Sequence, residues 1–515
     1  MTMNPENVYI TVEKPPINNV TRKGAIPSPP FVAVFHTPNA WYVYDVITNE
    51  FFRTTKEFAA CVPYCDGRSS EEVRKAIGFD IDKSTVESIL NQIRTLQHEK
   101  GYFLSSELQG LAHRHDAEQV GDIIDNQLEQ LILCVTERCN LDCRYCIYSG
   151  SYHYQRQHSG KSMGIDIALK AVDFYLAHSK HADKRHISFY GGEPLLNLKL
   201  IKAVISYIED MIPSTQGIKF NLTTNGVLLK GDILDYLVSK GISILISLDG
   251  PKEIHDRDRI YRKDKRGTFQ DIYNNLIVLK EKYPEYFERE VTFAATVSQG
   301  NKLRTIYEFY RDDPMLHSTK HVVLNAVDPL NNDLVERDIL SEEQFDDNYV
   351  ALDYIRLISQ GEEPNAFLRS LYERNMIMIH QRPSNRLGHS ALPNGICTPG
   401  ARRLFCATDG SFQVCEKVNP GLTIGHVDRG IDVEKVNRII DDYIRMSEPD
   451  CMKCWAVRMC GLCFACAFTE EFSIENKRIY CEQQRETLLR DMAIYCNIRE
   501  RNNKAFAFID GTRFD

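Results

Sequence analysis

Apolar segments that alternate with amphipathic segments from residue 129 onward constrain the fold of this chain more than any other feature. Short apolar runs typical of buried strands occur at 130–135, 185–190, 218–223, 243–248, 290–297 and 320–325. Segments with helical periodicity, such as 165–179 and 199–212, lie between them. Strands that alternate with helices favour a parallel sheet with crossover helices, so the sequence predicts an α/β barrel or partial barrel. Side chains with chemical roles are then expected at the C-terminal ends of the strands.

The cysteine content is the second constraint. The chain has 515 residues, a net charge of −9 and 16 cysteines. Its first residues lack the basic and apolar layout of a signal peptide, so we expect a cytoplasmic protein whose cysteines do not form a disulfide framework. No apolar run approaches the roughly 18–20 residues of a membrane span, and there is no basic excess, so neither a membrane nor a nucleic acid is an expected partner. The cysteines therefore favour metal binding or catalysis.

Three of these cysteines directly follow the first strand of the predicted barrel. They form the motif Cys139-Asn-Leu-Asp-Cys143-Arg-Tyr-Cys146. A buried helical stripe would explain the spacing, but the charged and polar residues between the thiols suit a surface loop. Zinc is the stronger alternative, although structural zinc sites normally show paired CxxC units and four ligands. Three thiolates on an iron–sulfur cube would leave one iron open to a small chelating ligand.

This motif at the end of a first barrel strand resembles the signature of the radical S-adenosylmethionine (SAM) enzymes. The resemblance implies that the three cysteines hold a [4Fe–4S] cluster whose open iron chelates the amino and carboxylate groups of SAM. Further motifs extend it over residues 130–330. These are Gly191-Gly192-Glu193-Pro194, Thr223-Thr224-Asn225-Gly226 and Ser247-Leu248-Asp249-Gly250-Pro251, followed by His255 and Arg259.

The same resemblance assigns residues to SAM. Glu193, after the close backbone approach that Gly191 and Gly192 allow, can accept hydrogen bonds from the ligand ammonium. Ser247 and Arg259 are expected to contact the ribose and carboxylate. The main chain of Tyr145 and the region of Val327 are expected to hold the adenine. Without this resemblance each motif would be a turn or a surface ion pair.

A second field of cysteines occupies the C-terminal part of the chain. Its order, a Cys before Gly-x4-Cys, then Cys-x2-Cys-x5-Cys and a distant Cys, resembles the SPASM domain with two auxiliary [4Fe–4S] clusters. By position, Cys397, Cys406 and Cys415 would serve the first cluster, and Cys451, Cys454, Cys460 and Cys481 the second. One of Cys463 and Cys466 would complete the first, and the spacing leaves open which one. A pair of zinc knuckles is the alternative.

Glu416 is the candidate catalytic residue. It follows Cys415 at a place where the related sulfatase maturases carry an acidic residue beside the substrate. The resemblance makes it a base or a substrate contact, and a solvated surface carboxylate is the alternative.

The N-terminal part is predicted to form a separate unit. Three strand-like runs, FVAVF, WYVYDV and EFFRT, precede helical patterns. The arrangement is winged-helix-like and resembles the leader-peptide recognition element of peptide-modifying enzymes, which binds a leader as an added strand. A small domain without peptide binding is the alternative. The predicted division is an arm (1–28), this recognition unit (29–105), a linker (106–127), the partial (β/α)6 barrel (128–340), a helical bridge (341–395) and the SPASM domain (396–515).

These features together predict a radical SAM oxidoreductase that matures a ribosomally made, cysteine-rich peptide. The resemblance to the sactipeptide and ranthipeptide synthases implies thioether links from a cysteine sulfur to an α-carbon, formed through a 5′-deoxyadenosyl radical. The expected partners are a precursor peptide with a leader and a low-potential electron donor of the flavodoxin or ferredoxin type. The alternatives are a formylglycine-forming sulfatase-type maturase, a peptide epimerase or carbon–carbon crosslinking enzyme, and a non-catalytic zinc scaffold.

Overall fold

The structure is a computed structural model that describes residues 28–152, 154–212, 217–298, 301–327, 340–393 and 395–510. The arm expected at 1–28 lies outside these residues except for its last position. None of the helices in the described ranges is long and apolar enough to cross a membrane.

The centre of the molecule is a partial barrel of six parallel strands. These are β5 (Gln130–Thr136), β6 (Arg185–Gly191), β7 (Ile218–Thr224), β8 (Ser243–Ser247), β9 (Val291–Val297) and β10 (Val322–Ala326). Each is hydrogen-bonded to the next in parallel register. The predicted α/β partial barrel is therefore confirmed. Strand ends differ from the prediction by at most two residues, because buried apolar runs mark strands better than they mark their ends.

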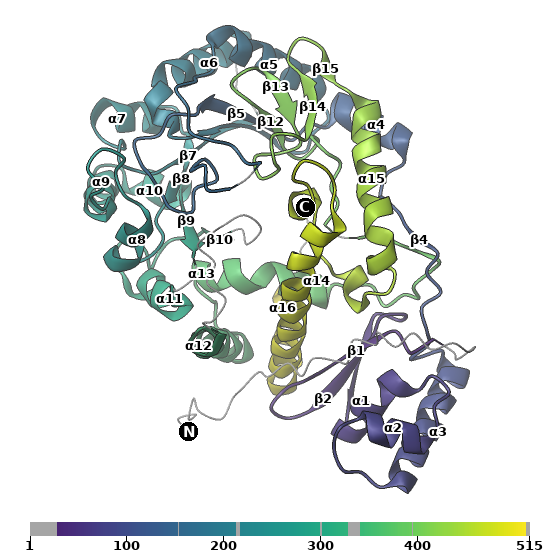
Figure 1. Ribbon diagram of the computed structural model, residues 1–515. Coiled ribbons are helices and arrows are strands. Elements are labelled where there is room, and N and C mark those ends of the chain that lie inside the picture. Colours follow the sequence, from purple (N-terminus) through teal and green to yellow (C-terminus); the bar gives the residue numbers. More distant parts are fainter. Residues whose placement is uncertain are drawn as a thin grey trace.

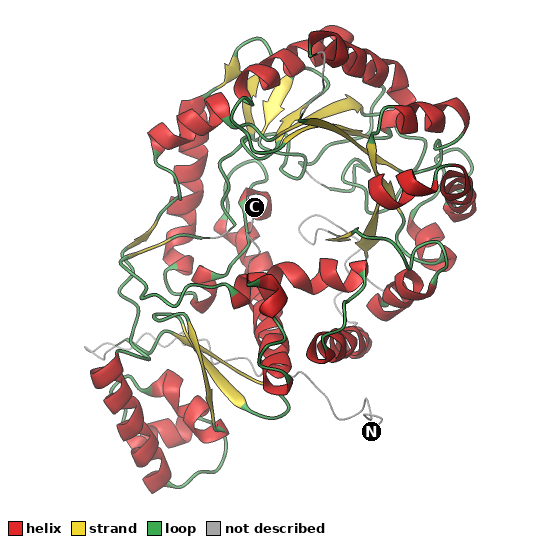
Figure 2. Cartoon of the chain, turned by 180° about the vertical axis from the view of Figure 1, so that it is seen from behind, coloured by secondary structure: helices red, strands yellow, loops and turns green. Residues whose placement is uncertain are grey.

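Helices cover the outside of this sheet (Figures 1 and 2). Their apolar faces pack against the strands, as in α5, where Ala168, Ala171, Val172 and Tyr175 are buried. The set comprises α5 (Ile165–His178), η3 (Pro194–Asn197), α6 (Leu198–Met211), α7 (Gly231–Ser239), α8 (Lys252–Asp258), α9 (Phe269–Lys282), α10 (Pro284–Glu290) and α11 (Leu303–Asp312). The strands' C-terminal ends are therefore left free of crossover helices and available for a site.

The C-terminal segment continues the barrel sheet. Strand β12 (Leu404–Cys406) pairs in parallel with β5, and β13 (Ser411–Gln413), β14 (Thr423–His426) and β15 (Gly430–Ile431) follow in antiparallel order. Two long helices, α15 (Val433–Cys451) and α16 (Ile474–Arg501), and short turns η5 (Trp455–Arg458), η6 (Phe464–Cys466) and η7 (Ala507–Ile509) complete it. Residues 488–498 of α16 are almost all buried, so this helix lacks the one-sided periodicity by which helices are recognised.

Helices connect the barrel to this segment. They are α12 (Leu340–Gln360), α13 (Ala366–Leu368), η4 (Arg369–Glu373) and α14 (Arg374–His380), and α12 and α14 contact α16. Strand β11 (Ser390–Ala391) then pairs with β4 (Gly110–Leu111). The segment predicted as a linker also differs from expectation. It contains α4 (Ala117–Asn126), whose Val120 and Ile124 are buried and which begins with a capping box at Asp116.

The N-terminal unit forms its own lobe (Figure 1). Strands β1 (Val32–His36), β2 (Trp41–Asp45) and β3 (Glu50–Thr54) form an antiparallel sheet with β2 in the centre. Helices α1 (Lys56–Cys61), α2 (Ser70–Ala76) and α3 (Lys83–Lys100), with the turn η2 (Val62–Tyr64), pack on it around a separate core. The unit contacts α16, because Tyr42 and Thr37 each donate a hydrogen bond to Glu500 at 2.7 Å.

Candidate functional site

The loop after β5 carries the first three cysteines. The backbone N–H groups of Leu141 and Tyr148 donate to the sulfurs of Cys139 and Cys146, each at 3.4 Å. Burial raises the pKa of each thiol, to about 12 at Cys139. The thiolate charges of Cys139 and Cys146 also raise the pKa of Cys143. The three sulfurs are therefore close neighbours in a desolvated site where they stay protonated unless a cation replaces the protons.

These residues fit an iron–sulfur cluster by the chemistry of their donor set. Three thiols project from one short loop, and backbone N–H groups already point at two of the sulfurs. Hydrogen bonds of this kind accompany cysteine-ligated clusters and tune their potential. Within the described ranges, no three Cys, His, Asp or Glu side chains converge closely enough to share a single metal ion.

The Gly-Gly-Glu motif at the end of β6 joins this loop through the backbone. A Cβ atom on Gly191 would lie 2.1 Å from the carbonyl oxygen of Thr136, and one on Gly192 would lie 2.2 Å from that of Arg138. Gly192 and Glu193 donate their N–H groups to the same carbonyls at 2.8 Å. Only glycine allows this approach, so the motif fixes the start of the cysteine loop against β6. The two glycines thus bring protein backbones together.

Glu193 is fully buried and accepts three hydrogen bonds. They come from Leu195 N at 3.1 Å, the Thr224 hydroxyl at 2.8 Å and Asn225 N at 2.8 Å. Burial raises the pKa of this carboxyl to about 7, although the three donors oppose the increase. Asn225 in turn donates to Asn140 at 2.8 Å and lies 3.9 Å from the Cys139 sulfur. Glu193 therefore links the ends of β6 and β7 to the cysteine loop.

A second buried network lies at the end of β8. Asp249 accepts hydrogen bonds from Arg259 Nε at 2.8 Å, from Thr296 N at 3.0 Å and from the Tyr145 hydroxyl. The Arg259 guanidinium stacks over the Tyr145 ring at 5.3 Å. Burial raises the pKa of Tyr145 well above its usual range, so the phenol stays protonated and donates. The structure thus brings Tyr145 and Arg259 together beside Cys143, whose pKa Arg259 lowers.

The remaining two residues predicted to contact SAM also lie at strand ends. Ser247 is the last residue of β8, is partly buried, and pairs with Ala294 of β9. Val327 follows β10 and donates its N–H to the Val297 carbonyl at 3.3 Å, while Asp328 and Pro329, which come next, lie outside the described residues. Both therefore share the barrel edge that carries the cysteine loop.

The C-terminal cysteines form two groups. In the first, the charges of Cys463 and Cys415 add to burial in raising the pKa of Cys397, and Cys466 donates to Cys463 and lowers its pKa to about 6. In the second, Cys451 and Cys454 add to burial in raising the pKa of Cys460, and both also affect Cys481. The first cysteine group is Cys397, Cys415, Cys463 and Cys466, and the second is Cys451, Cys454, Cys460 and Cys481.

Cys406 does not join either group, unlike the prediction. It ends β12, is fully buried, and the thiol that most affects its pKa after burial is that of Cys134 on β5. Its strand is hydrogen-bonded to β5, which keeps the thiol in the core of the extended sheet. Both Cys463 and Cys466 lie in the first cysteine group, so each could be the fourth thiol that spacing alone left open.

Glu416 faces the barrel rather than solvent. Its side chain is 13% exposed and pairs with Arg403. Its Oε2 is buried without a hydrogen-bond partner. The Glu416 charge adds to burial in raising the pKa of Tyr190 at the end of β6, and Cys146 and Arg156 also affect this phenol. Arg156 donates to the Glu416 carbonyl at 2.8 Å, which ties the two segments together. An unpaired buried carboxylate oxygen at this edge can accept a proton or a substrate hydrogen bond.

Sequence reasoning missed three residues that contact the cysteine loop. Asp249 and Asn225 lie within motifs that were recognised, but their roles depend on partners from other strands. His158 lies 3.9 Å from the Cys146 sulfur through Nε2 and 3.0 Å from the Glu137 carbonyl through Nδ1. Nothing in the local sequence distinguishes this histidine from a surface residue.

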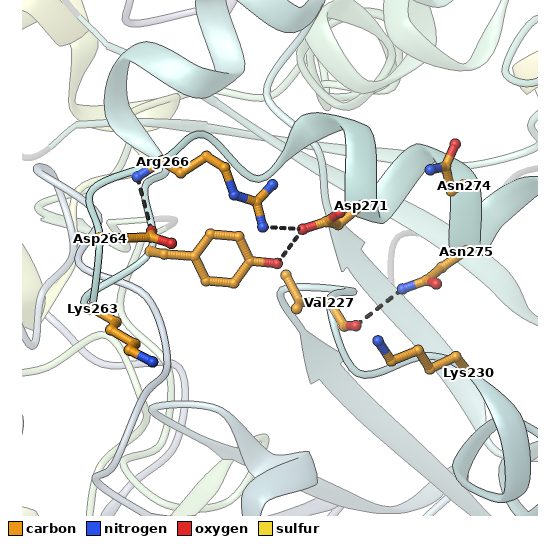
Figure 3. Close-up of a pocket in the computed structure, with 9 residues that line it drawn as sticks. Val227, Lys230, Lys263, Asp264, Arg266, Asp271, Asn274 and Asn275 are labelled. Atoms are coloured by element: carbon orange, nitrogen blue, oxygen red, sulfur yellow. Dashed lines mark hydrogen bonds and ion pairs between the residues drawn. The ribbon is translucent and has the colours of Figure 1, made fainter.

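A polar pocket of about 550 Å³ lies beside this site (Figure 3). Arg266 donates to Asp271 at 2.8 Å, and Asn275 donates to the Val227 carbonyl at 3.0 Å. Tyr261, which also lines the pocket, forms a β-bridge with Leu141 of the cysteine loop. The polar groups that line this pocket mostly form hydrogen bonds with one another, and the lining contains no cysteine.

Comparison with known proteins identifies the barrel. Residues 133–312 match the Radical SAM superfamily, and this match begins within β5 and ends with α11. The chain contains a radical SAM domain. Such a domain implies SAM and a [4Fe–4S] cluster as cofactors, which agrees with the three thiols and the glycine and carboxylate motifs around them.

Similarity to individual relatives and solved structures extends beyond this domain. The chain is 26% identical over 215 residues to the radical SAM cyclopropyl synthase TigE of Paramaledivibacter caminithermalis, covering 39% of this chain and 43% of TigE. It is 23% identical over 374 residues to a cysteine-type anaerobic sulfatase-maturating enzyme of Clostridium perfringens, covering 70% and 95%. The structure of anSMEcpe with bound AdoMet has the same fold, with a TM-score of 0.53, 18% identity and coverage of 75% and 98%. The chain spans about half the length of the first curated relatives that it matches.

Proposed function

We propose that this protein is a radical SAM maturase that forms thioether links between cysteine sulfurs and α-carbons of a ribosomally made, cysteine-rich peptide. The observation that carries the proposal is the combination of three parts in one chain. A cysteine loop suited to SAM chemistry lies at the barrel edge, two further groups of four cysteines follow it, and a small sheet with an open edge precedes it.

The cysteine loop is the proposed site of radical formation. Cys139, Cys143 and Cys146 would hold the [4Fe–4S] cluster, which, when SAM is bound, supplies the electron that cleaves SAM to a 5′-deoxyadenosyl radical. Ser247 ends β8 and Arg259 follows α8, and both would contact SAM. Asp249, which comes directly after β8, fixes the Arg259 guanidinium. Tyr145, stacked against Arg259, closes this side of the loop and excludes water from the sulfurs.

Glu416 is the proposed base on the substrate side. Thioether formation requires the substrate cysteine to lose its thiol proton, and the Oε2 of Glu416 is a buried acceptor without a partner. Its neighbour Arg403 keeps the other oxygen in place. The carboxylate follows Cys415 directly, so it would hold the substrate between the cysteine loop and the first cysteine group.

The auxiliary cysteines suit an oxidative reaction. Each thioether link removes two hydrogens from the peptide, and one electron of that oxidation must leave with an acceptor. Two [4Fe–4S] clusters on the first and second cysteine groups would provide it, and a flavodoxin- or ferredoxin-type donor would reduce the SAM-binding cluster.

The N-terminal sheet is the proposed site of leader recognition. Strand β3 pairs only with β2 among the described residues, so its other edge is open to an added strand. Helices α1, α2 and α3 cover one face of the same unit. A leader bound there would hold the core peptide near the barrel and would thereby raise the effective concentration of the core peptide at the cysteine loop.

A sulfatase-type maturase is the second candidate, because the matched sulfatase-maturating enzyme of Clostridium perfringens is covered over 95% of its length. That reaction converts a cysteine or serine side chain to formylglycine and needs no leader. The structure of anSMEcpe with the Cp18Cys peptide has a TM-score of 0.52 to this chain, so a protein of related fold binds a peptide.

Anaerobic reconstitution with SAM, dithionite and the cysteine-rich peptide encoded nearest to the gene tests the proposal. We expect release of 5′-deoxyadenosine and loss of two hydrogens per link by mass spectrometry, with deuterium moving from a labelled α-carbon to 5′-deoxyadenosine. Replacement of sulfur by oxygen together with loss of two hydrogens would indicate conversion of a cysteine to formylglycine instead. A peptide whose mass is unchanged after reaction in H2O, and which gains one deuterium after reaction in D2O, would indicate epimerisation. A colourless protein with zinc, rather than a brown one with about twelve iron atoms, would indicate the scaffold.

A further inference from the structure

Lys477 is a buried lysine on α16, with 3% of its surface exposed. Its ammonium donates to the Ser447 hydroxyl at 2.6 Å and to the Cys451 sulfur at 3.4 Å. It also lies 4.5 Å from the centre of the Tyr443 ring. No carboxylate forms an ion pair with it in the part of the chain that the structure describes. A buried cation is costly unless a counter-charge offsets it, and the nearest group able to supply one is the Cys451 thiolate.

A second cation accompanies Lys477. Lys477, Cys481 and Arg485 follow one another at four-residue spacing on α16, so they lie on one face of the helix. The Arg485 side chain donates to Cys454 and lowers its pKa against the effect of burial. The pKa of Cys481 is likewise raised by burial and lowered by both cations. Lys477 also lowers the pKa of Cys460, so the two cations act on all four thiols of the second cysteine group.

The first cysteine group has a different surrounding. The neighbouring carboxylate of Glu416 adds to burial in raising the pKa of Cys415, where the second group has ammonium and guanidinium donors. Tyr443 lies between the two groups, since Cys463 and Cys466 of the first and Cys451 and Cys460 of the second all affect its pKa. Cations act on the first group too, because Arg402 lowers the pKa of Cys397, and Lys417 and Arg374 lower that of Cys463. The two groups are thus neighbours that differ in one respect: a carboxylate acts on a thiol of the first, whereas a buried ammonium is hydrogen-bonded to a thiol of the second.

We infer that Lys477, assisted by Arg485, raises the reduction potential of the cluster on the second cysteine group above that of the cluster on the first. One-electron reduction adds a negative charge to a thiolate-bound cluster, and a desolvated cation that donates to a ligand sulfur stabilises that charge. This inference rests on the auxiliary clusters of the proposed function. It goes beyond that function by stating which of the two clusters has the higher reduction potential.

The order gives a direction to the electron. When the thioether forms, the peptide α-carbon has lost a hydrogen atom to the 5′-deoxyadenosyl radical and the substrate thiol has lost a proton. Bond formation then leaves one electron, which reduces an oxidised auxiliary cluster from the 2+ to the 1+ state. The first cysteine group lies beside Glu416 and receives this electron, and the second, at higher potential, draws it away from the substrate.

Redox titration followed by electron paramagnetic resonance tests this inference. The full chain is reconstituted anaerobically in a background with Cys139, Cys143 and Cys146 replaced by Ala, so that only auxiliary clusters contribute. We expect two potentials, of which Lys477→Met lowers the higher one by about 59 mV, a tenfold change in the reduction equilibrium. Lys477→Arg keeps the charge and should restore most of the difference.

Two further variants make the result specific. Lys453→Met removes an exposed lysine between Cys451 and Cys454, and solvent screening should leave both potentials unchanged. Arg485→Gln should shift the same potential as Lys477→Met in the same direction, and it serves where the lysine variant does not fold. Full iron content, together with potentials that neither variant changes, would overturn this inference but leave the proposed auxiliary clusters in place. Absence of iron from this background would overturn the auxiliary clusters themselves, and the inference with them.

Discussion

At the scale of single residues, the site depends on buried charges that are paired across strands. Asp249 is 1% exposed and holds Arg259, which is 8% exposed, as well as Tyr145 from the cysteine loop. A buried ion pair is costly to assemble, and it is retained here at the place where the cysteine loop must keep one shape. The sequence indicated Arg259 as a SAM contact, and the structure adds the carboxylate that positions it.

Replacement of Asp249 by Asn should destabilise the protein strongly. The Arg259 guanidinium would stay buried without its counter-charge, which costs roughly 3–5 kcal/mol. Urea denaturation measures this loss. Asp264→Asn is the matched control, because Asp264 is exposed and accepts only the Arg266 N–H, so its change should stay within about 0.5 kcal/mol. An equal loss of unfolding free energy in the two variants would show that the buried ion pair contributes no more to stability than the exposed carboxylate does.

The stability of the chain should depend on pH through Asp491. Burial raises the pKa of this carboxyl to about 6, against the charge of Arg490 and the hydrogen bond from Asn375. Its pKa when folded exceeds the unfolded value, so the folded state binds the extra proton and stability falls as the pH rises from about 4 to 6.

Asp491→Asn tests this dependence. Between pH 5 and 7.5 the wild type should lose about 1 kcal/mol of unfolding free energy relative to the variant. Urea unfolding of the apo chain at both pH values measures it, with the exposed Asp441→Asn as control. Parallel pH profiles of the wild type and Asp491→Asn would contradict the expectation.

At the scale of elements, the two C-terminal cysteine groups are assembled from loops that are distant in sequence. The first cysteine group draws on residues before β12, after β13 and around η6, whereas the second draws on the end of α15, the following turn and α16. Each group closes only when the C-terminal segment packs. Neither group is a contiguous motif.

Cysteine substitutions should separate ligands from core residues. Cys466→Ala should lose about four iron atoms per chain, the content of one cube, because its thiol lies with Cys463 in the first cysteine group. Cys406→Ala should keep its full iron content, since its thiol lies with Cys134 in the core. Iron and sulfide analysis of both reconstituted variants measures the difference. Iron loss in Cys406→Ala with none in Cys466→Ala would reverse the assignment.

Leader binding should protect the edge of β3. Hydrogen exchange of the backbone amides of Glu50–Thr54 should slow when the precursor peptide is added, because an added strand would pair with them. Amides of β14 (Thr423–His426), in the distant sheet extension, are the internal control and should not change. Protection at the barrel edge without protection at β3 would favour a maturase that needs no leader.

The accuracy of the sequence analysis followed the range of the interactions. The barrel strands and the position of the cysteine loop could be predicted, because buried runs and close spacings are local signals. The place of Cys406 and the pairing of Asp249 could not, since each depends on which strands become neighbours. The extent of helix α16 could not be found from periodicity for a related reason: residues 488–498 are almost all buried, so no polar face marks them.

At the scale of the whole molecule, one sheet joins the parts that the proposed chemistry requires. The parallel strands of the radical SAM domain continue through β12 into the antiparallel strands β13, β14 and β15, so the segment bearing Cys415 and Glu416 is fixed to the strand that precedes Cys139. Helix α16 then connects the second cysteine group near its start to the N-terminal unit at Glu500 near its end. The N-terminal unit, the two C-terminal cysteine groups and the cysteine loop are thereby parts of one continuous framework (Figure 1).

The most direct test of the central claim is the release of 5′-deoxyadenosine from SAM by the reduced, anaerobically reconstituted protein. The account predicts release by the wild type and none by Cys143→Ala, whose auxiliary cysteines stay intact and which should keep about eight of about twelve iron atoms. Release by Cys143→Ala at the wild-type rate, or a wild type that binds zinc and cleaves no SAM, would contradict it.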